Sequence, residues 1–271
     1  MGKDRLKGLQ LAPGEQAGLA QRSTDDRLGM ADKVEGEAEL ERLQLRLDDL
    51  HDRLWAESKR SVLLVLQGMD AAGKDGTVRK VLTGLNPQGC TVTAFKAPSD
   101  NELAHDYLWR VHAACPPRGK LGTFNRSHYE DVVAARAIGV IDDHQCVDRY
   151  THIREFERML VDEGTAIVKV FLHISNEEQR ARLQARLEDP KKRWKFNADD
   201  LTVREQWGLH AKLYERALTA TSTKWAPWWI VPADRKWVRN VAVAELLVRT
   251  LEDLDPQFPE PDPALDGVVV D

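Results

Sequence analysis

The stretch Gly68-Met69-Asp70-Ala71-Ala72-Gly73-Lys74-Asp75-Gly76-Thr77 decides the fold, and it follows directly on the apolar segment Val62–Gln67. It fits the pattern G-x-x-x-x-G-K between an expected strand and an expected helix, the setting of a phosphate-binding loop, or P-loop. Its glycines let the backbone N–H groups point inward, and the helix N-terminus adds partial positive charge. A glycine-rich turn that only joins strand to helix is the alternative. We expect Lys74 on the terminal phosphates, with further phosphate contacts at Gly68, Ala71, Ala72, Gly73, Gly76 and Thr77.

Two acidic residues depart from the usual P-loop. Asp75 stands where a Ser or Thr hydroxyl normally helps to hold Mg²⁺. Asp70, inside the loop, would repel a bound phosphate unless a cation lay between them. We therefore predict that Asp70 is a Mg²⁺ ligand or orients the acceptor, and an exposed acid in a local turn is the alternative.

A second candidate segment, Phe124–Asp131, follows a short apolar run. In P-loop folds the strand beside the loop normally ends on a metal-linked Asp, and Asn125 stands in that place. Arg126 follows at the carboxyl edge of the expected sheet, where ligands of open α/β folds bind. Its guanidinium is suited to bracing a transferring phosphoryl group. A structural ion pair of Arg126 with Glu130 or Asp131 is the alternative.

A third segment is strongly cationic. Between Arg186 and Phe196 stand five positive and two negative side chains, in a chain whose net charge is −5. Arg182 and Arg186 share one helix face, and Asp189-Pro190 ends that helix. We interpret the region 182–200 as a lid that closes over polyanions, and a solvated charged surface is the alternative. The phosphate contacts expected from it are Arg182, Lys191, Lys192 and Arg193.

The segment 101–110 is less specific. It contains several polar side chains, and we take Asp106 as a candidate for contact with the acceptor. A mixed exposed helix explains the segment equally well.

Short apolar runs alternate with longer helical stretches through most of the chain. This alternation predicts an α/β fold in which helices cover both faces of a parallel sheet, in one domain over 35–254. Strands are expected at Val62–Gln67, Thr91–Phe95, Leu121–Phe124, Ala166–Ile174 and Trp229–Pro232. Helices are expected near 74–84, 100–114, 128–136, 144–163, 175–188, 199–220 and 236–254.

The two ends of the chain differ from this pattern. Residues 1–34 are polar with scattered Gly and Pro, and we expect a loosely ordered N-terminal arm. Within 35–57, leucines recur every three or four residues and predict a leading helix. Its leucine stripe is expected to pack on the domain's own core or to make a subunit contact. The C-terminal tail 255–271 is rich in Pro and acidic residues.

Composition narrows the classes of function. The chain has 271 residues and an acidic net charge of −5, which argues against nucleic acid as a partner. Its three cysteines form no C-x-x-C pair, which argues against common zinc sites and disulfide scaffolds and suits a reducing cytoplasm. The apolar runs are too short to span a membrane, and the N-terminus lacks the apolar core of a signal peptide. We therefore expect a cytoplasmic protein.

Four segments together resemble the type-2 polyphosphate kinases, and the resemblance covers roughly residues 54–251. They are Gly68–Thr77, Phe124–Asp131, Arg182 and Arg186 with Asp189–Asn197, and Ala226–Arg239. That family has a thymidylate-kinase-like P-loop fold, uses Mg²⁺ (with Mn²⁺ as an alternative) and assembles as homodimers or homotetramers. The resemblance implies catalytic roles for Asp70, Lys74, Arg126 and Arg186, with Asp70 as the metal ligand. Asn125 with Glu130 resembles the branch that accepts both nucleoside mono- and diphosphates, so these two residues are expected to contact the acceptor.

The implied reaction moves the terminal phosphoryl group of inorganic polyphosphate to AMP or ADP. Such transfer depends mainly on positioning and charge neutralisation. Two other interpretations stay open. One is an ATP-dependent nucleotide or nucleoside kinase, because fold and loop do not name the donor. The other is a non-catalytic nucleotide-binding module that assembles through its leucine-striped helix, which the departures Asp75 and Asn125 favour.

Overall fold

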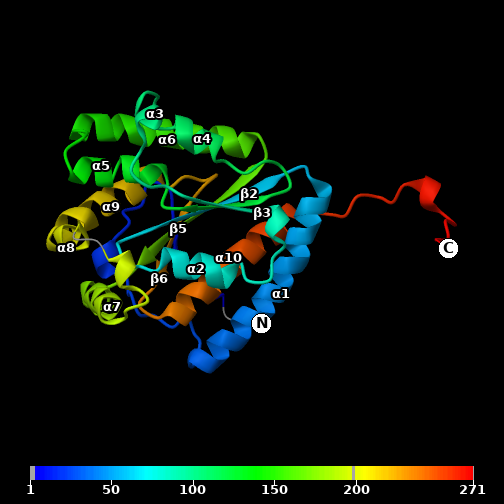
Figure 1. Cartoon of the computed structure of the whole chain (residues 1–271), viewed down its shortest axis with the longest axis horizontal. Coiled ribbons are helices and arrows are strands. Elements are labelled where there is room, and N and C mark those ends of the chain that lie inside the picture. Colours follow the sequence, from blue (N-terminus) through cyan, green and yellow to red (C-terminus); the bar gives the residue numbers. More distant parts are fainter. Residues whose placement is uncertain (1–3, 197–198, 271) are drawn as a thin grey trace.

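The computed structural model describes residues 4–196 and 199–270, and a six-stranded sheet lies at its centre (Figure 1). Its strands are β1 (Gln10–Leu11), β2 (Ser61–Gly68), β3 (Cys90–Ala94), β4 (Leu121–Asn125), β5 (Thr165–His173) and β6 (Trp228–Pro232). They lie in the order β1-β6-β5-β2-β4-β3. Neighbouring strands from β6 to β3 are parallel, and β1 is antiparallel to β6.

The five strands expected from the sequence are all present, each within one residue of its expected ends. Every residue of β2 is buried, because both faces of a central parallel strand are covered. The sequence does not predict β1, whose two residues pair with Trp228 and Trp229. The parallel sheet is therefore confirmed for the five main strands and gains an antiparallel edge strand.

Helices cover both faces of the sheet, as expected (Figure 1). On one face α10 (Lys236–Leu254) packs on β5 and β6, with α2 (Lys74–Val81) beside it and α1 (Lys33–Glu57) on its outer side. On the other face α6 (Asp143–Asp162) packs on β5, and α9 (Trp207–Thr221) packs on α6. The loop to α2 begins where β2 ends. Because β2 is parallel to its neighbours, this loop lies at the carboxyl edge of the sheet.

Three of the expected helices are interrupted. In the region 100–114, the Asp106 carboxylate accepts a hydrogen bond from the Leu108 N–H at 2.9 Å, and this local turn separates two short helices. The regions 128–136 and 199–220 are also each divided into two shorter elements. The shorter elements are α3 (Asp100–Leu103), α4 (Trp109–Ala113), α5 (Ala134–Ala137), α7 (Asn176–Glu188), α8 (Asp199–Glu205), and the 3-10 turns η1 (Leu19–Gln21), η2 (Pro87–Gly89), η3 (His128–Asp131), η4 (Arg193–Lys195) and η5 (Pro263–Leu265).

The leading helix α1 begins after Asp32, whose carboxylate caps the N–H of Glu35 at 3.0 Å. Its stripe of leucines is buried against the rest of the domain, mainly on α10. These leucines are Leu40, Leu43, Leu47, Leu50 and Leu54. Packing on the domain's own core is therefore correct, and a subunit contact through this stripe is wrong.

The expectation of a loosely ordered arm is wrong for residues 4–32. Leu6, Leu11 and Leu19 are buried in the core, and β1 completes the sheet. The Glu215 carboxylate of α9 accepts hydrogen bonds from Gly18 and Leu19 N–H at 2.6 and 2.8 Å. The local sequence has no period to reveal this, because the segment's partners lie about two hundred residues further along the chain. Residues 1–3 of the expected arm lie outside the described residues.

After α10, residues 255–270 extend away from the body of the domain, with the short turn η5 (Figure 1). The last residue of the expected tail, at position 271, is not among the described residues. Of the helices in the described ranges, none combines the length and apolar character needed to cross a membrane.

Candidate active site

The P-loop offers a nest of open backbone donors at the start of α2. Gly73 has φ 102°, a conformation that L side chains rarely adopt, so this turn requires glycine. Within the described part of the chain, the N–H groups of Gly73, Lys74 and Gly76 make no hydrogen bond. Open N–H groups in the first turn of a helix are suited to bind an anion.

Two residues that were expected to contact phosphate make hydrogen bonds within the loop instead. The Ala72 N–H donates to the Met69 carbonyl at 3.0 Å. The N–H and the hydroxyl of Thr77 both donate to the Gly73 carbonyl, at 2.9 and 3.1 Å, and Thr77 is fully buried. We therefore reassign Ala72 and Thr77 from phosphate contact to closure of the loop.

Lys74 is the first residue of α2, and its ammonium folds back over the loop. Nζ donates to the carbonyl oxygens of Gly68 at 2.7 Å and Met69 at 3.4 Å. Burial lowers the pKa of Lys74, and the nearby carboxylates of Asp70 and Glu130 act in the opposite direction. An ammonium held on carbonyl oxygens is placed to exchange them for phosphate oxygens.

β4 brings Arg126 to the P-loop. Its Nη2 donates to Asp70 Oδ1 at 2.8 Å, and its side chain is 44% exposed at the open edge of the sheet. Arg126 has φ 63°, which is unusual for a residue with a side chain. The pKa of Arg126 is raised: burial opposes its charge, but Asp70 and Glu130 outweigh that effect. The ion pair that Arg126 makes is therefore with Asp70, and not with Glu130 or Asp131 as in the alternative interpretation.

Glu130 lies in the turn that follows Arg126. Burial raises the pKa of its carboxyl, while Arg126 and Lys74 act against this rise. When the Gln67 amide is oriented to satisfy both of its partners, its nitrogen donates to Glu130 Oε1 at 3.0 Å. From α9, the Tyr214 hydroxyl donates to the P-loop backbone at 3.3 Å. Gln67 and Tyr214 were not predicted as site residues from the sequence, although a polar residue at the end of an apolar strand is a signal for Gln67.

The two departures from the P-loop pattern face each other. Asn125 Nδ2 donates to Asp75 Oδ1 at 2.6 Å. A usual P-loop pairs a neutral hydroxyl on the helix with an Asp on the strand. Here the helix carries the carboxylate and the strand carries the neutral amide. The pair therefore keeps a single negative charge, moved from the strand to the helix.

A buried network anchors the η3 turn from beneath. The Tyr129 hydroxyl donates to Glu157 Oε1 at 2.8 Å, and Lys169 Nζ donates to Glu157 Oε2 at 2.6 Å. Burial acts to raise the pKa of Glu157, but Lys169 and His128 outweigh it, so the pKa of this carboxyl is lowered. Burial also lowers the pKa of Lys169, and Glu157 offsets this only in part. The network fixes the turn that carries Glu130 to β5 and α6.

Arg182 does not face the open nest, so the expected phosphate contact is wrong there. The residue is buried on α7, and its Nε pairs with Glu178 Oε1 at 2.7 Å. Its guanidinium fastens α7 to the P-loop and to the loop after β6. It donates to the carbonyl oxygens of Ala71 (3.0 Å), Ala72 (2.8 Å), Ala233 (2.6 Å) and Asp234 (2.9 Å).

The lid residues are more open. Arg186 lies half-buried on α7 and makes no ion pair or hydrogen bond with a described residue. Lys191, Lys192 and Arg193 are exposed in the turn after α7, where Lys192 pairs with Asp189 at 2.7 Å. Residues 197–198 of the expected lid lie outside the described residues.

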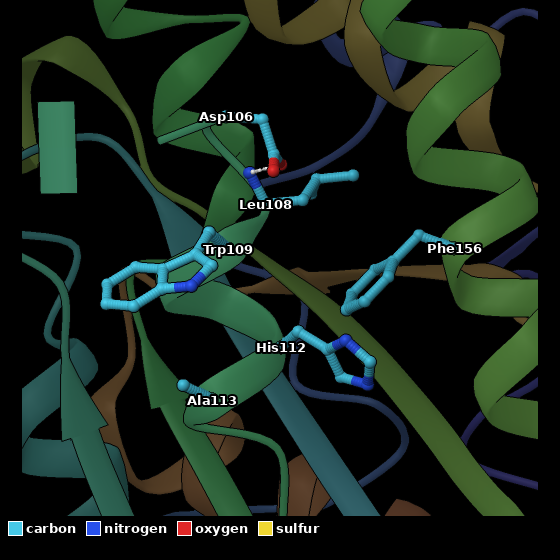
Figure 2. A pocket seen from close by; sticks show the side chains of 6 residues that line it. All are labelled: Asp106, Leu108, Trp109, His112, Ala113 and Phe156. Carbon is cyan, nitrogen blue, oxygen red and sulfur yellow. Dashed lines mark hydrogen bonds between the residues drawn. The ribbon is translucent and has the colours of Figure 1, made fainter. Parts of the chain in front are cut away.

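Asp106 lies apart from these charges. It lines an open pocket of about 490 Å³ between α4 and α6 (Figure 2). Arg110, on α4, approaches the Asp131 carboxylate of η3 at 3.8 Å, so a wall of the pocket is linked to the turn that carries Glu130. The other lining residues are Leu108, Trp109, His112, Ala113 and Phe156.

The residues present suit a hard cation that also binds substrate phosphates. The described residues hold no group of three or more His, Cys, Asp or Glu side chains placed to cage a metal. Mg²⁺ commonly binds through one or two carboxylates together with substrate phosphates and water. The Asp70 carboxylate, on the loop itself and 22% exposed, provides such an oxygen donor.

The site consists of a P-loop at the edge of a parallel sheet, with a lysine, an arginine–carboxylate pair and an exposed cationic segment. These features define a phosphotransferase of the P-loop kinase class. Residues 30–259 match the model of the polyphosphate kinase 2 family. This chain belongs to that family.

The relatives agree with this assignment. The chain is 52% identical to the AMP/ADP-polyphosphate phosphotransferase of Meiothermus ruber, over 84% of this chain and 86% of that one. It is 45% identical to the ADP-polyphosphate phosphotransferase of Rhodopseudomonas palustris, over 83% of each. The crystal structure of polyphosphate kinase 2 from Arthrobacter aurescens superposes with a TM-score of 0.93 at 40% identity, over 97% of this chain and 95% of the other.

Proposed function

We propose that this protein transfers the terminal phosphoryl group of inorganic polyphosphate to AMP and to ADP. The observation that carries the proposal is the convergence of Asp70, Lys74 and Arg126 on an open nest of N–H donors. The exposed cations of the lid suit a long polyanion as donor better than a short one. The names of the relatives in Meiothermus ruber and Rhodopseudomonas palustris support the same donor and acceptors.

The chain's own groups would act by positioning and by neutralising charge. The N–H groups of Gly73, Lys74 and Gly76 hold the phosphate at the transfer point, and the Lys74 ammonium leaves its carbonyl partners for phosphate oxygens. Arg126 and Arg186 balance the charge that develops during transfer. Mg²⁺, with Mn²⁺ as its substitute, would be held by Asp70 and would neutralise phosphate oxygens.

The acceptor is proposed to approach from the side of β4. Asn125 and Glu130 lie at the carboxyl end of that strand, next to Arg126 and Lys74. The pocket of Asp106 and Trp109 has the volume and the flat aromatic lining that a nucleobase requires (Figure 2). We therefore assign the acceptor's phosphates to the strand end and its base to this pocket.

One assay tests the proposal. AMP, ADP and GDP are each incubated with polyphosphate and Mg²⁺ or Mn²⁺, and the nucleotide products are separated and quantified. We expect ADP and ATP from AMP, and ATP from ADP. Turnover with ATP as donor and none with polyphosphate would instead identify an ATP-dependent kinase, and no turnover with either donor would identify a binding module.

The lid is expected to serve the donor more than the acceptor. Replacing Lys191, Lys192 and Arg193 together with Ala should raise the KM for polyphosphate about tenfold and weaken its dependence on salt, because each lost cation removes a screened contact. The KM for AMP and ADP should change little. The measurement is initial rate against polyphosphate concentration at several ionic strengths.

A matched control removes three exposed cations from the opposite edge of the sheet. Lys59, Arg118 and Lys224 precede β2, β4 and β6 and are all exposed. Their triple Ala variant should keep the wild-type KM and salt slope. If both triple variants behave alike, the lid residues form only a solvated surface.

Asn125→Asp should shift the choice of acceptor. The new carboxylate would face Asp75, whose Oδ1 lies 2.6 Å from the replaced amide nitrogen, and the two negative charges would repel each other and the incoming phosphates. We expect kcat/KM for ADP to fall about tenfold more than kcat/KM for AMP, or about 1.4 kcal/mol of differential transition-state stabilisation, because ADP brings the larger negative charge.

The control for this variant restores the charge. In the double variant Asn125→Asp with Asp75→Asn, the pair again holds one carboxylate, and the AMP to ADP ratio should return toward that of the wild type. Initial rates with both acceptors at saturating polyphosphate give the ratio. An unchanged ratio in the single variant would remove Asn125 from acceptor selection.

We also propose that the chain assembles as a homodimer or homotetramer, because it belongs to this family. A cytoplasmic location is proposed from the sequence. Sedimentation velocity of the purified chain measures the first.

A further inference from the structure

Arg239, in the first turns of α10, lies directly behind the P-loop. Its side chain is buried, with 3% of the residue exposed. Nη1 donates to the Ala72 carbonyl at 3.0 Å, and Nε and Nη2 donate to Asn240 Oδ1 at 3.2 and 3.1 Å. A Cβ added at Gly73 would collide with Nη1. The guanidinium therefore forms the rear wall of the turn that carries the open N–H donors.

This contact orients the nest. In a trans peptide the C=O and the following N–H point in opposite directions. The Ala72 carbonyl accepts from Arg239 and from Arg182, so the Gly73 N–H of the same peptide points away from both arginines, toward the open side of the loop. Arg239 thus sets the direction of a donor that we assign to phosphate.

The charge of Arg239 has no counterion in the described part of the structure. No carboxylate pairs with it there, whereas Arg182 has Glu178 at 2.7 Å. Its hydrogen-bond acceptors are a backbone carbonyl and an amide oxygen, both neutral. Burial, together with the neighbouring Arg182, lowers the pKa of Arg239 to about 9. A buried charge without a partner is normally costly, so an unpaired guanidinium in this position needs a reason.

The surroundings of Arg239 add positive charge. The first turn of α10 contains no acidic residue and begins with Lys236. Burial lowers the pKa of Lys236, and the nearby charges of Arg182 and Arg239 lower it as well. Acidic residues usually occupy the first turn of a helix because they complement its dipole. Here the sequence places cations there, on the far side of the loop that we assign to the donor's phosphates.

We propose that Arg239 is a positioning residue whose uncompensated charge is balanced across the P-loop by the phosphates of the bound donor. The proposal rests on polyphosphate being the donor. This role has an effect on stability that is not expected for an arginine that only supports the backbone. Removing the charge should stabilise the free protein and, at the same time, weaken its stabilisation by a polyphosphate.

Two variants separate charge from hydrogen bonding. Arg239→Gln removes the charge and keeps an amide donor for the Ala72 carbonyl, whereas Arg239→Lys keeps the charge with fewer donors. Arg154→Gln is the matched control, since Arg154 also donates to a backbone carbonyl, that of Ala220 at 2.8 Å, but lies on α6. The two Gln variants change the net charge of the chain equally.

The experiment measures thermal unfolding with and without tripolyphosphate and Mg²⁺, and the KM for polyphosphate at several salt concentrations. For Arg239→Gln we expect a higher Tm of the free protein, a tripolyphosphate-induced rise in Tm at most half that of the wild type, and a KM for polyphosphate raised about tenfold with a weaker salt dependence. Arg239→Lys should keep the ligand-induced rise and the salt slope, and Arg154→Gln should match the wild type in both.

Three results would overturn the inference: a lower Tm of free Arg239→Gln with an unchanged salt slope, a full ligand-induced rise in that variant, or equal losses in Arg239→Lys and Arg239→Gln. Each of these would make Arg239 a hydrogen-bonding support of the loop only. Failure of the proposed function is recognised separately, because then the wild type itself gives neither a Tm shift with tripolyphosphate nor turnover with polyphosphate.

Discussion

Lys74→Ala is expected to lower kcat/KM with polyphosphate about a thousandfold or more while the protein stays folded. The ammonium donates hydrogen bonds to the Gly68 and Met69 carbonyl oxygens of the P-loop, and it can exchange these acceptors for phosphate oxygens. A loss of this size corresponds to about 4 kcal/mol of transition-state stabilisation. Stability should not suffer greatly, because the change removes a buried charge whose pKa burial already lowers.

The measurement pairs steady-state rates with thermal unfolding. Lys80→Ala is the matched control, since Lys80 is an exposed lysine at the other end of the same helix and should behave as wild type in both assays. Lys74→Arg keeps the charge on a longer, branched group, and we expect it to recover only a small part of the rate. Near wild-type turnover in a folded Lys74→Ala protein would contradict the role assigned to the loop.

Gly73→Ala is expected to cause a large loss of stability. Two effects add. The residue has φ 102°, which strains any L side chain, and its new Cβ would collide with the Arg239 guanidinium. The strain alone costs about 1–2 kcal/mol. The collision must also move a buried arginine that supports the Ala72 carbonyl, so the nest should be disturbed and activity lost together with stability.

Gly84→Ala isolates the first effect. Gly84 has φ 97°, and nothing lies within 4 Å of the position its Cβ would take. Its Tm should fall by a few degrees, as expected for about 1–2 kcal/mol, without loss of turnover. The Tm of Gly73→Ala should fall clearly further. Equal losses of Tm in the two variants would mean that the guanidinium moves aside freely.

Much of the site could be predicted because its signals are local. The spacing of Gly68, Gly73 and Lys74 and the apolar strand before them define the loop within about ten residues of sequence. The positions of Arg126 and Glu130 beside the loop were predicted in the same way, because both residues follow a recognisable strand whose carboxyl end meets the loop at one edge of the sheet, and their roles stay predictions. The family resemblance then supplied the donor, which no local pattern contains.

The direction in which a side chain points could not be predicted from the sequence. Arg182 carries the charge and the helix position expected of a phosphate ligand, yet it is buried and donates to backbone carbonyls of the P-loop. Thr77 carries the expected hydroxyl, yet that group closes the loop on Gly73. Composition shows that such groups exist, and only packing shows which partner satisfies them.

By itself, then, the sequence determined the five parallel strands, the covering helices, the P-loop and a cationic segment after α7, because hydrophobic period and glycine spacing act over a few residues. The tertiary structure alone decided that residues 4–32 dock on the domain, that Asn125 faces Asp75, and that Arg182 and Arg239 stand behind the loop. Each of these contacts joins segments fifty or more residues apart. They form because a buried polar or charged group must find a partner in space, and the folded sheet, not the order of residues along the chain, determines which partners are near.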